Sequence, residues 1–225
     1  MSSTTNTEHL STIWNDYISR KNIIKDPIPL FEIDDQLFVE TKRIGRDDRY
    51  ILKRSQAIDE KLRKAAHLVR VNPNKYEGIL YMMYQIKNEQ VIPRYIGKTE
   101  TVGKTGRISS LLKGKSPKPR WDDYDQYHIG ELSKAVCKGY EGVKIGKQYK
   151  LWADELFAKT KVLKPKLVSN LYLDLNPWRY DEVGLWKDYG ATSLGLHESM
   201  LIDISRKIFS EKLLNIDGVT RKLSN

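Results

Sequence analysis

The stretch that decides the fold reads Gly78-Ile79-Leu80-Tyr81, followed one short loop later by Tyr95-Ile96-Gly97-Lys98-Thr99. Two apolar runs separated by polar residues predict a β-hairpin. Each run places a tyrosine at a set position, and the second run also carries a lysine. The hairpin is therefore expected to present two phenols and an ammonium group from neighbouring strands.

Composition sets the limits within which this hairpin is interpreted. The chain has 225 residues, of which 40% are hydrophobic and 30% are charged, as in an ordinary globular protein. It carries 39 Lys and Arg against 29 Asp and Glu, a formal charge of +10 that favours polyanionic partners such as nucleic acid. No run approaches the roughly 18 apolar residues of a membrane helix. We therefore expect a soluble, cytoplasmic protein that has no membrane partner.

A single cysteine, Cys137, excludes an internal disulfide and a zinc site built from cysteines. It lies within a predicted helix, on the apolar face. We interpret it as a small buried hydrophobe.

Hydrophobic spacing predicts several helices and few strands. Ser55 is a good N-cap, and the apolar residues that follow it share one helical face; they are Ile58, Leu62, Ala65, Ala66 and Val69. The other predicted helices cover residues 10–18, 107–113, 129–138, 151–160 and 194–214. Outside the hairpin, strands are predicted within residues 30–41 and over residues 167–175, where Pro177 would end the strand.

These elements predict an α+β fold, with a small antiparallel sheet flanked by helices. Residues 1–75 form an N-terminal helical and strand extension, which would serve as a DNA-binding or dimerisation arm. Residues 76–216 form the core, with an insertion over about 113–180. Residues 217–225 are a basic tail.

The order of motifs along the chain resembles that of the GIY-YIG nuclease superfamily, and within it the restriction-endonuclease-like members. After the two tyrosine motifs come Arg107 at the start of a predicted helix, Glu198 within Leu196-His197-Glu198-Ser199-Met200-Leu201-Ile202, and Leu213-Leu214-Asn215. The resemblance implies a catalytic set whose members are Tyr81, Tyr95, Lys98, Arg107, Glu198 and Asn215. It also implies that Glu198 is a metal ligand, with Mg²⁺ as the cofactor and Mn²⁺ as a substitute.

Two tyrosines compete for the first position of the motif. Tyr81 follows Gly78-Ile79-Leu80 and fits the glycine and its apolar neighbours, whereas Tyr84 lies nearer to Tyr95, at the spacing that many members show. Residues three apart point to opposite faces of a strand, so only one of them can share the catalytic face. We choose Tyr81, on the expectation that residues 89–94 form an enlarged hairpin tip.

Glu198 is predicted to project from a largely apolar arc of its helix, where a carboxylate is costly unless it is paired or binds a cation. In the expected mechanism Tyr81 or Tyr95 deprotonates an in-line water with help from Lys98. Arg107 steadies the charged phosphate, and the metal on Glu198 stabilises the leaving 3′ oxygen. Several family members have a histidine where this chain has Leu111. His128 and His197 are the candidates to replace it, but neither is assigned to the site, and the missing histidine points to tyrosine as the proton acceptor.

The resemblance implies a site-specific double-stranded DNA endonuclease of type II restriction type that leaves a 5′-phosphate and a 3′-hydroxyl. The segment with Lys113, Lys115, Lys118 and Arg120 is predicted to grip the DNA backbone. Because each site would hold one metal and cut one DNA strand, cutting both strands suggests a homodimer. A restriction function also suggests a cognate DNA methyltransferase. The alternatives are a phage or mobile-element nuclease, and a catalytically inactive nucleic-acid-binding protein of the same fold.

Overall fold

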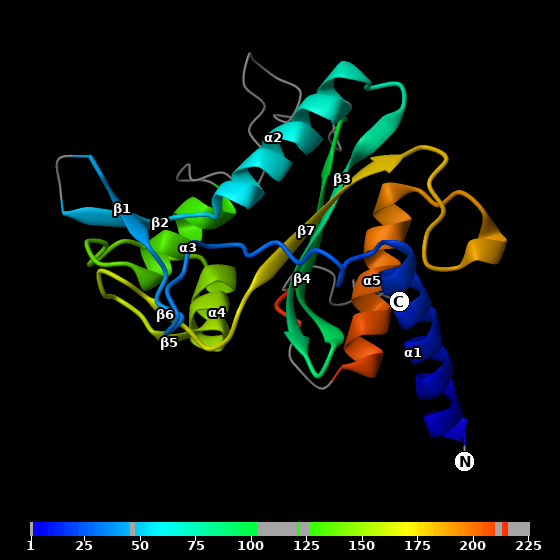
Figure 1. Ribbon diagram of the computed structural model, residues 1–225, viewed down its shortest axis with the longest axis horizontal. Coiled ribbons are helices and arrows are strands. Elements are labelled where there is room, and N and C mark those ends of the chain that lie inside the picture. The colour runs from blue at the N-terminus through cyan, green and yellow to red at the C-terminus, as the bar shows by residue number, and fades with distance from the viewer. Residues whose placement is uncertain (1, 46–47, 103–120, 122–126, 210–212, 216–225) are drawn as a thin grey trace, which may run out of the picture.

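A three-stranded antiparallel sheet in the order β4-β3-β7 lies at the centre of the computed structural model (Figure 1). Its strands are β3 (Tyr76–Lys87), β4 (Gln90–Glu100) and β7 (Tyr172–Arg179). The structure describes residues 2–45, 48–102, 121, 127–209 and 213–215. The α+β class predicted from the sequence is confirmed, because helices flank this small sheet.

The β3-β4 hairpin is confirmed, but its tip differs from the expectation. The turn contains only Asn88 and Glu89, at φ 49° and 62°, and β4 begins directly after it at Gln90. Two consecutive left-handed residues are typical of the tight turn whose twist matches the flanking strands. The register shifts after the Met83–Tyr95 pair, so that Pro93 lies opposite Tyr84. A bulge in an edge strand, where proline is tolerated, therefore takes up the extra residue.

Strand β3 is buried on both faces, and its side chains alternate between two hydrophobic cores. Odd-numbered residues such as Tyr81 and Met83 contribute to the first, which we call the large core. Even-numbered residues such as Met82 and Tyr84 contribute to the second, the small core. The period of two along a strand thus separates the molecule into two packed halves.

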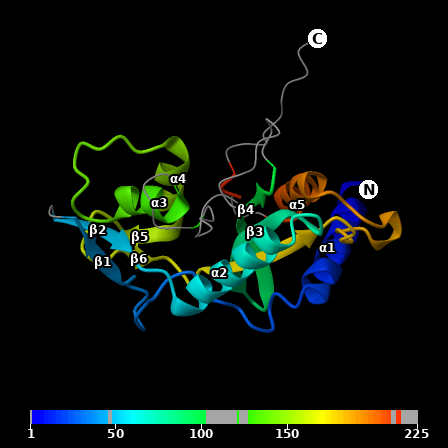
Figure 2. The same cartoon turned by 90° about the horizontal axis from the view of Figure 1, so that it is seen from above.

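Helices α1 (Ser2–Arg20) and α5 (Leu194–Ile208) lie side by side on the small-core face (Figures 1 and 2). The large core is covered by α2 (Gln56–Val71), α3 (His128–Val136) and α4 (Lys147–Leu156). Two small sheets complete that half, one formed by β1 (Thr41–Ile44) and β2 (Arg49–Leu52), the other by β5 (Phe157–Lys159) and β6 (Lys166–Leu167). A short 3₁₀ turn, η1 (Lys187–Tyr189), precedes α5.

Helix α2 forms as the sequence predicts. The Ser55 hydroxyl accepts a hydrogen bond from the backbone N–H of Ile58 at 3.2 Å and satisfies one of the free donors of the first turn. The five apolar residues predicted to share a face are all buried. Cys137, which follows α3, is buried as expected, and burial raises the pKa of its thiol to about 12.

Several predicted boundaries are wrong, among them the start of α1, which is Ser2 rather than residue 10, and the start of β7, which is Tyr172 rather than residue 167. Helix α5 ends at Ile208 rather than at 214. Helix α4 lies four residues earlier than predicted, because Phe157–Lys159 leaves the helix to pair with β6. Strand β7 continues through Pro177 to Arg179, which is possible because β7 is an edge strand whose outer side needs no ladder.

The first 75 residues are packed into the same two cores as the rest of the chain. Trp14 and Ile18 of α1 lie in the small core, and Leu30 and Val39 lie in the large core. The segment predicted as an insertion over about 113–180 includes β7, which supplies the third strand of the central sheet. No helix in the part of the chain that the structure describes has both the length and the apolar character required to cross a bilayer.

His197 is a buried imidazole in the small core. Its ring stacks on Trp178 with centroids 4.3 Å apart, and neither ring nitrogen has a hydrogen-bond partner among the described residues. Burial lowers its pKa to about 3, and the nearby cations Lys21 and Arg20 contribute in the same direction. The folded protein therefore holds this histidine neutral at pH values where an unfolded chain would protonate it.

Replacing His197 with Phe should flatten the acid side of the stability profile. Below a pH of about 6.5 the unfolded state of the wild type binds a proton that the folded state does not, so its stability falls as the pH falls towards 3. The variant has no histidine at this position for the unfolded state to protonate. As the pH falls from about 7.5 to about 5, its free energy of unfolding should therefore rise by about 2 kcal/mol relative to that of the wild type. Urea unfolding at both pH values measures this, and parallel profiles would contradict the assignment.

Candidate functional site

Tyr81 and Tyr95 come from neighbouring strands and lie on the large-core face of the sheet. Tyr81 is opposite Gly97 across the β3-β4 ladder, and Met83 is opposite Tyr95. The two phenol rings are stacked with centroids 6.2 Å apart. The Tyr81 ring also covers Gly97, where an added Cβ would lie 2.5 Å from the tyrosine Cε2. The glycine of the second motif is thus required by the tyrosine of the first.

A histidine that the sequence reasoning had considered only as a replacement lies beside these tyrosines. The His128 Nε2 is 3.4 Å from the Tyr81 hydroxyl, and its Nδ1 is 3.0 Å from the Tyr149 hydroxyl. Trp121 and Trp152 enclose the imidazole with ring centroids 4.9 and 5.3 Å away. Tyr81 and His128 are both buried. Tyr81, His128 and Tyr149 thus lie in a row, and we call the two tryptophans that enclose the imidazole, Trp121 and Trp152, the aromatic box.

Lys98 and Glu198 meet on the opposite face of the sheet. The Lys98 Nζ lies 3.6 Å from the Glu198 Oε2 and 2.6 Å from the Glu100 Oε1. An added Cβ at Gly195 would lie 2.8 Å from the Lys98 Nζ, so this glycine lets the lysine lie against the first turn of α5. All three charged side chains are partly buried, with 21 to 34% of each exposed.

Glu100 belongs to this charged group, although the sequence reasoning did not select it. It lies two residues after Lys98 on β4, and residues two apart on a strand share a face. That spacing is the feature of the sequence from which the position of Glu100 beside Lys98 could have been predicted. Glu77 lies near the same end of the sheet, where its carboxylate accepts a hydrogen bond from the backbone N–H of Leu194 at the start of α5.

The described residues therefore form two groups instead of the single predicted site. Tyr81 and Tyr95 share one face with His128, whereas Lys98 and Glu198 share the α5 face with Glu100. Arg107 lies outside the described residues, as do the predicted DNA-binding residues, which are Lys113, Lys115, Lys118 and Arg120.

Tyr84 belongs to neither group. Its ring stacks on Tyr172 in the small core, with centroids 5.5 Å apart, and its hydroxyl donates to the Ile23 carbonyl at 3.2 Å. Burial raises the pKa of this phenol above its usual range. Tyr84 therefore packs away from Tyr95, while Tyr81 is the tyrosine that lies against it.

Asn215 lies at the edge of the sheet, and its side chain pairs with the backbone of β4. Its side-chain oxygen accepts from the Ile96 N–H at 3.0 Å, and its amide nitrogen donates to the Ile96 carbonyl at 2.6 Å. The backbone N–H of Leu214 donates to the Arg94 carbonyl at 2.7 Å. Residues 213–215 thus cover the free edge of β4, and the carboxamide of Asn215 acts as a substitute peptide group.

Metal ligands are few in the described part of the chain. No group of three or more histidine, cysteine, aspartate or glutamate side chains suited to a metal ion occurs among those residues. Glu198 and Glu100 supply two carboxylates around a position that the Lys98 ammonium takes in the structure. One or two carboxylates, completed by water and phosphate oxygens, are the usual protein contribution to Mg²⁺. The donor chemistry fits that ion.

The chain was also compared with known proteins. No family model matches it, and neither a curated protein nor a solved structure matches it.

Gly97→Ala should destabilise the protein by about 1–3 kcal/mol, because the new methyl group meets a buried ring that is already packed on several sides. Tyr81→Ala on its own is also costly, but the double variant should lose less than the sum of the two single losses. Urea unfolding of the four proteins measures the coupling. Gly146→Ala is the control, since its Cβ would meet only an ordinary contact at 3.6 Å; additive losses would exclude the clash.

Asn215→Ala should cost about 1–2 kcal/mol of stability, because two backbone groups of Ile96 lose their partner. Amide hydrogen exchange at Ile96 should become faster in the variant. Asn74→Ala, at an exposed position in the turn before β3, should leave both quantities unchanged. A variant with wild-type stability and exchange would show that Asn215 does not hold the edge of β4.

Proposed function

We propose that this chain is a divalent-metal-dependent endonuclease that hydrolyses phosphodiester bonds at specific sites in double-stranded DNA. The observation that supports it most is the meeting of Lys98 and Glu198. Both residues were selected from sequence motifs far apart in the chain, and the fold brings their charged groups to 3.6 Å. Their side chains are partly exposed and can reach a substrate. The net charge of +10 favours a polyanionic substrate.

Glu198 is the residue that would hold the metal, with water and phosphate oxygens completing its coordination. When bound, Mg²⁺ would supply charge to the scissile phosphate and to the leaving oxygen. Mn²⁺ is expected to substitute. The Lys98 ammonium, which pairs with Glu198 in the structure, would then contact a phosphate oxygen of the substrate.

Lys98 then has the main electrostatic role among the described residues. Its flexible stem lets the ammonium move from Glu100 to a non-bridging phosphate oxygen, where it offsets the charge that develops during attack. Glu100 is left as the nearest described carboxylate able to orient the attacking water and accept its proton. Arg107 remains a proposed phosphate ligand by resemblance.

In this proposal Tyr81 and Tyr95 have a structural role and do not deprotonate the water. Because Tyr81 and Tyr95 lie on the face opposite the Lys98–Glu198 pair, their rings hold the two strands in register around Gly97. The phenol oxygen of Tyr81 lies 3.4 Å from the His128 Nε2. The products are proposed to carry 5′-phosphate and 3′-hydroxyl ends. A homodimer, and a partner methyltransferase that protects host DNA, complete the restriction-type proposal.

A second candidate function is DNA binding without cleavage. It is favoured by one observation, the position of Lys98 between two carboxylates, which neutralises the groups a metal needs. Cleavage assays separate the two functions. They do so equally for a restriction enzyme and for a nuclease of a phage or mobile element.

Wild-type protein should cut plasmid DNA in Mg²⁺ and not in EDTA. Glu198→Gln and Lys98→Met should each lower kcat by about 10²–10³, since each removes a charge that acts on the phosphate or its metal. Tyr81→Phe should stay within the same order of magnitude as wild type. Single-turnover cleavage with sequenced product ends measures all of these.

Asp203→Asn is the matched control, because it removes an exposed carboxylate from the same helix as Glu198. DNA retention without metal-dependent cutting by the wild type would establish the binding function in place of the nuclease. Full activity of Glu198→Gln would remove the metal assignment. A loss in Tyr81→Phe as large as that in Lys98→Met would return the chemistry to the tyrosine face.

A further inference from the structure

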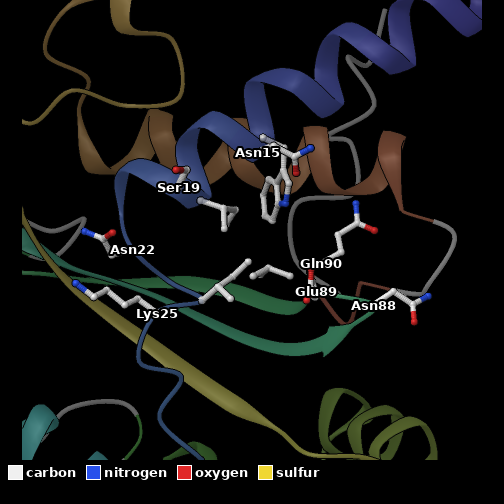
Figure 3. Close-up of a pocket in the computed structure, with 11 residues that line it drawn as sticks. Asn15, Ser19, Asn22, Lys25, Asn88, Glu89 and Gln90 are labelled. Atoms are coloured by element: carbon white, nitrogen blue, oxygen red, sulfur yellow. The ribbon is translucent and has the colours of Figure 1, made fainter.

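A pocket of about 560 Å³ lies between helix α1 and the tip of the β3-β4 hairpin. In Figure 3, Asn15 and Ser19 come from α1, Asn22 and Lys25 lie to one side, and the turn residues lie to the other. The volume falls within the range of small-molecule sites. Nothing in the proposed nuclease chemistry uses this pocket, which lies near the hairpin tip, whereas Lys98 and Glu100 lie at the other end of β4.

Four of the eleven lining residues carry a carboxamide. Asn15, Asn22, Asn88 and Gln90 each contribute one, and none of their side chains forms a hydrogen bond or an ion pair within the described part of the chain. The hydroxyl of Ser19 lies with them, and it too lacks such a bond there. All of these polar side chains are exposed, so their donors and acceptors face solvent and are accessible to a ligand.

The pocket is electrically balanced and partly apolar. One ammonium, from Lys25, and one carboxylate, from Glu89, stand on different sides of it (Figure 3). The apolar part of the lining includes Ile24 and the buried side chain of Trp14, whose indole N–H has no partner among the described residues. The whole chain carries a formal charge of +10, but the two charges of this pocket cancel. The pocket therefore has no net positive charge with which to select a phosphate group.

Left-handed backbone is concentrated at this pocket. Five described residues other than glycine have a positive φ, and three of them line it, namely Asn22, Asn88 and Glu89. At Asn88 and Glu89 this backbone belongs to the tight hairpin turn, in which asparagine is favoured. The turn thereby places an amide and a carboxylate at the edge of the pocket.

We propose that this pocket binds a nucleobase. Asn and Gln carboxamides pair with the donor and acceptor edge of a base, as they do with adenine in DNA recognition. Amides at both sides of an apolar middle match a planar heterocycle that has polar edges and an apolar face. A free nucleoside and an unstacked base of bound DNA present the same chemistry, and the site accepts either source. The proposal goes beyond the proposed nuclease function and does not depend on it.

The test uses the full chain in EDTA, so that cleavage plays no part. Adenosine and cytidine, both uncharged, are titrated by calorimetry, and a short DNA duplex is titrated by fluorescence anisotropy. The variant is Asn88→Gly combined with Gln90→Ala, which removes two amides without changing net charge and suits the left-handed turn. Asn74→Ala removes an exposed amide elsewhere and is the matched control.

Saturable adenosine binding that weakens about tenfold or more in the double variant, and stays unchanged in Asn74→Ala, would establish the site for a free nucleoside. No nucleoside binding, but an equal loss of duplex affinity in the double variant, would establish it for a base of DNA. Unchanged affinities for nucleoside and duplex would overturn the proposal. So would a duplex affinity that falls only in Lys25→Ala, because the pocket would then contact phosphate.

Discussion

The burial of strand β3 on both faces is the constraint on which the structure depends. Because side chains alternate along a strand, each residue of β3 is assigned to one of two cores, and the partner residues on β4 and β7 follow. Tyr81 is directed towards His128 and the tryptophans, whereas its neighbours Leu80 and Met82 are directed towards α1 and α5. The same alternation sends Lys98 to α5 and leaves Tyr95 on the other side. The chemistry available on each face is fixed by this register.

Local signals in the sequence predicted the main helices and the central hairpin, but they missed the short strands β1, β2, β5 and β6, and they placed several boundaries wrongly. Ser55 and the apolar face of α2 were sufficient, since capping and the helical period are properties of the segment itself. The ends of α4 and α5 could not be predicted in the same way. Phe157–Lys159 leaves α4 because a distant strand, β6, is present to pair with it, and residues 213–215 leave the helical path because β4 offers a free edge. Contacts of this kind are absent from the local pattern.

The candidate site shows the same division. Tyr95 and Lys98 are three residues apart on β4, so the period of two that separates Tyr81 from Tyr84 also places these two side chains on opposite faces, and the sequence was sufficient to predict this. The meeting of Lys98 with Glu198 depends in addition on the position of α5 against the sheet, which is a property of the assembled fold. Glu100 was within reach of sequence reasoning, because its spacing from Lys98 places both residues on one face. The roles of Gly97 and Asn215 required the neighbouring Tyr81 ring and the β4 edge to be known.

We propose that a divalent metal binds on the α5 face, and paramagnetic broadening by Mn²⁺ in ¹⁵N-labelled protein measures where the metal binds. Two sets of signals distinguish the faces: the backbone amides of Gly195 and Ser199 on the first turns of α5, and the indole N–H groups of Trp121 and Trp152 in the aromatic box. The account predicts that substoichiometric Mn²⁺ broadens the α5 amides and leaves the two indoles sharp. Broadening of the indoles with unchanged α5 amides would contradict it.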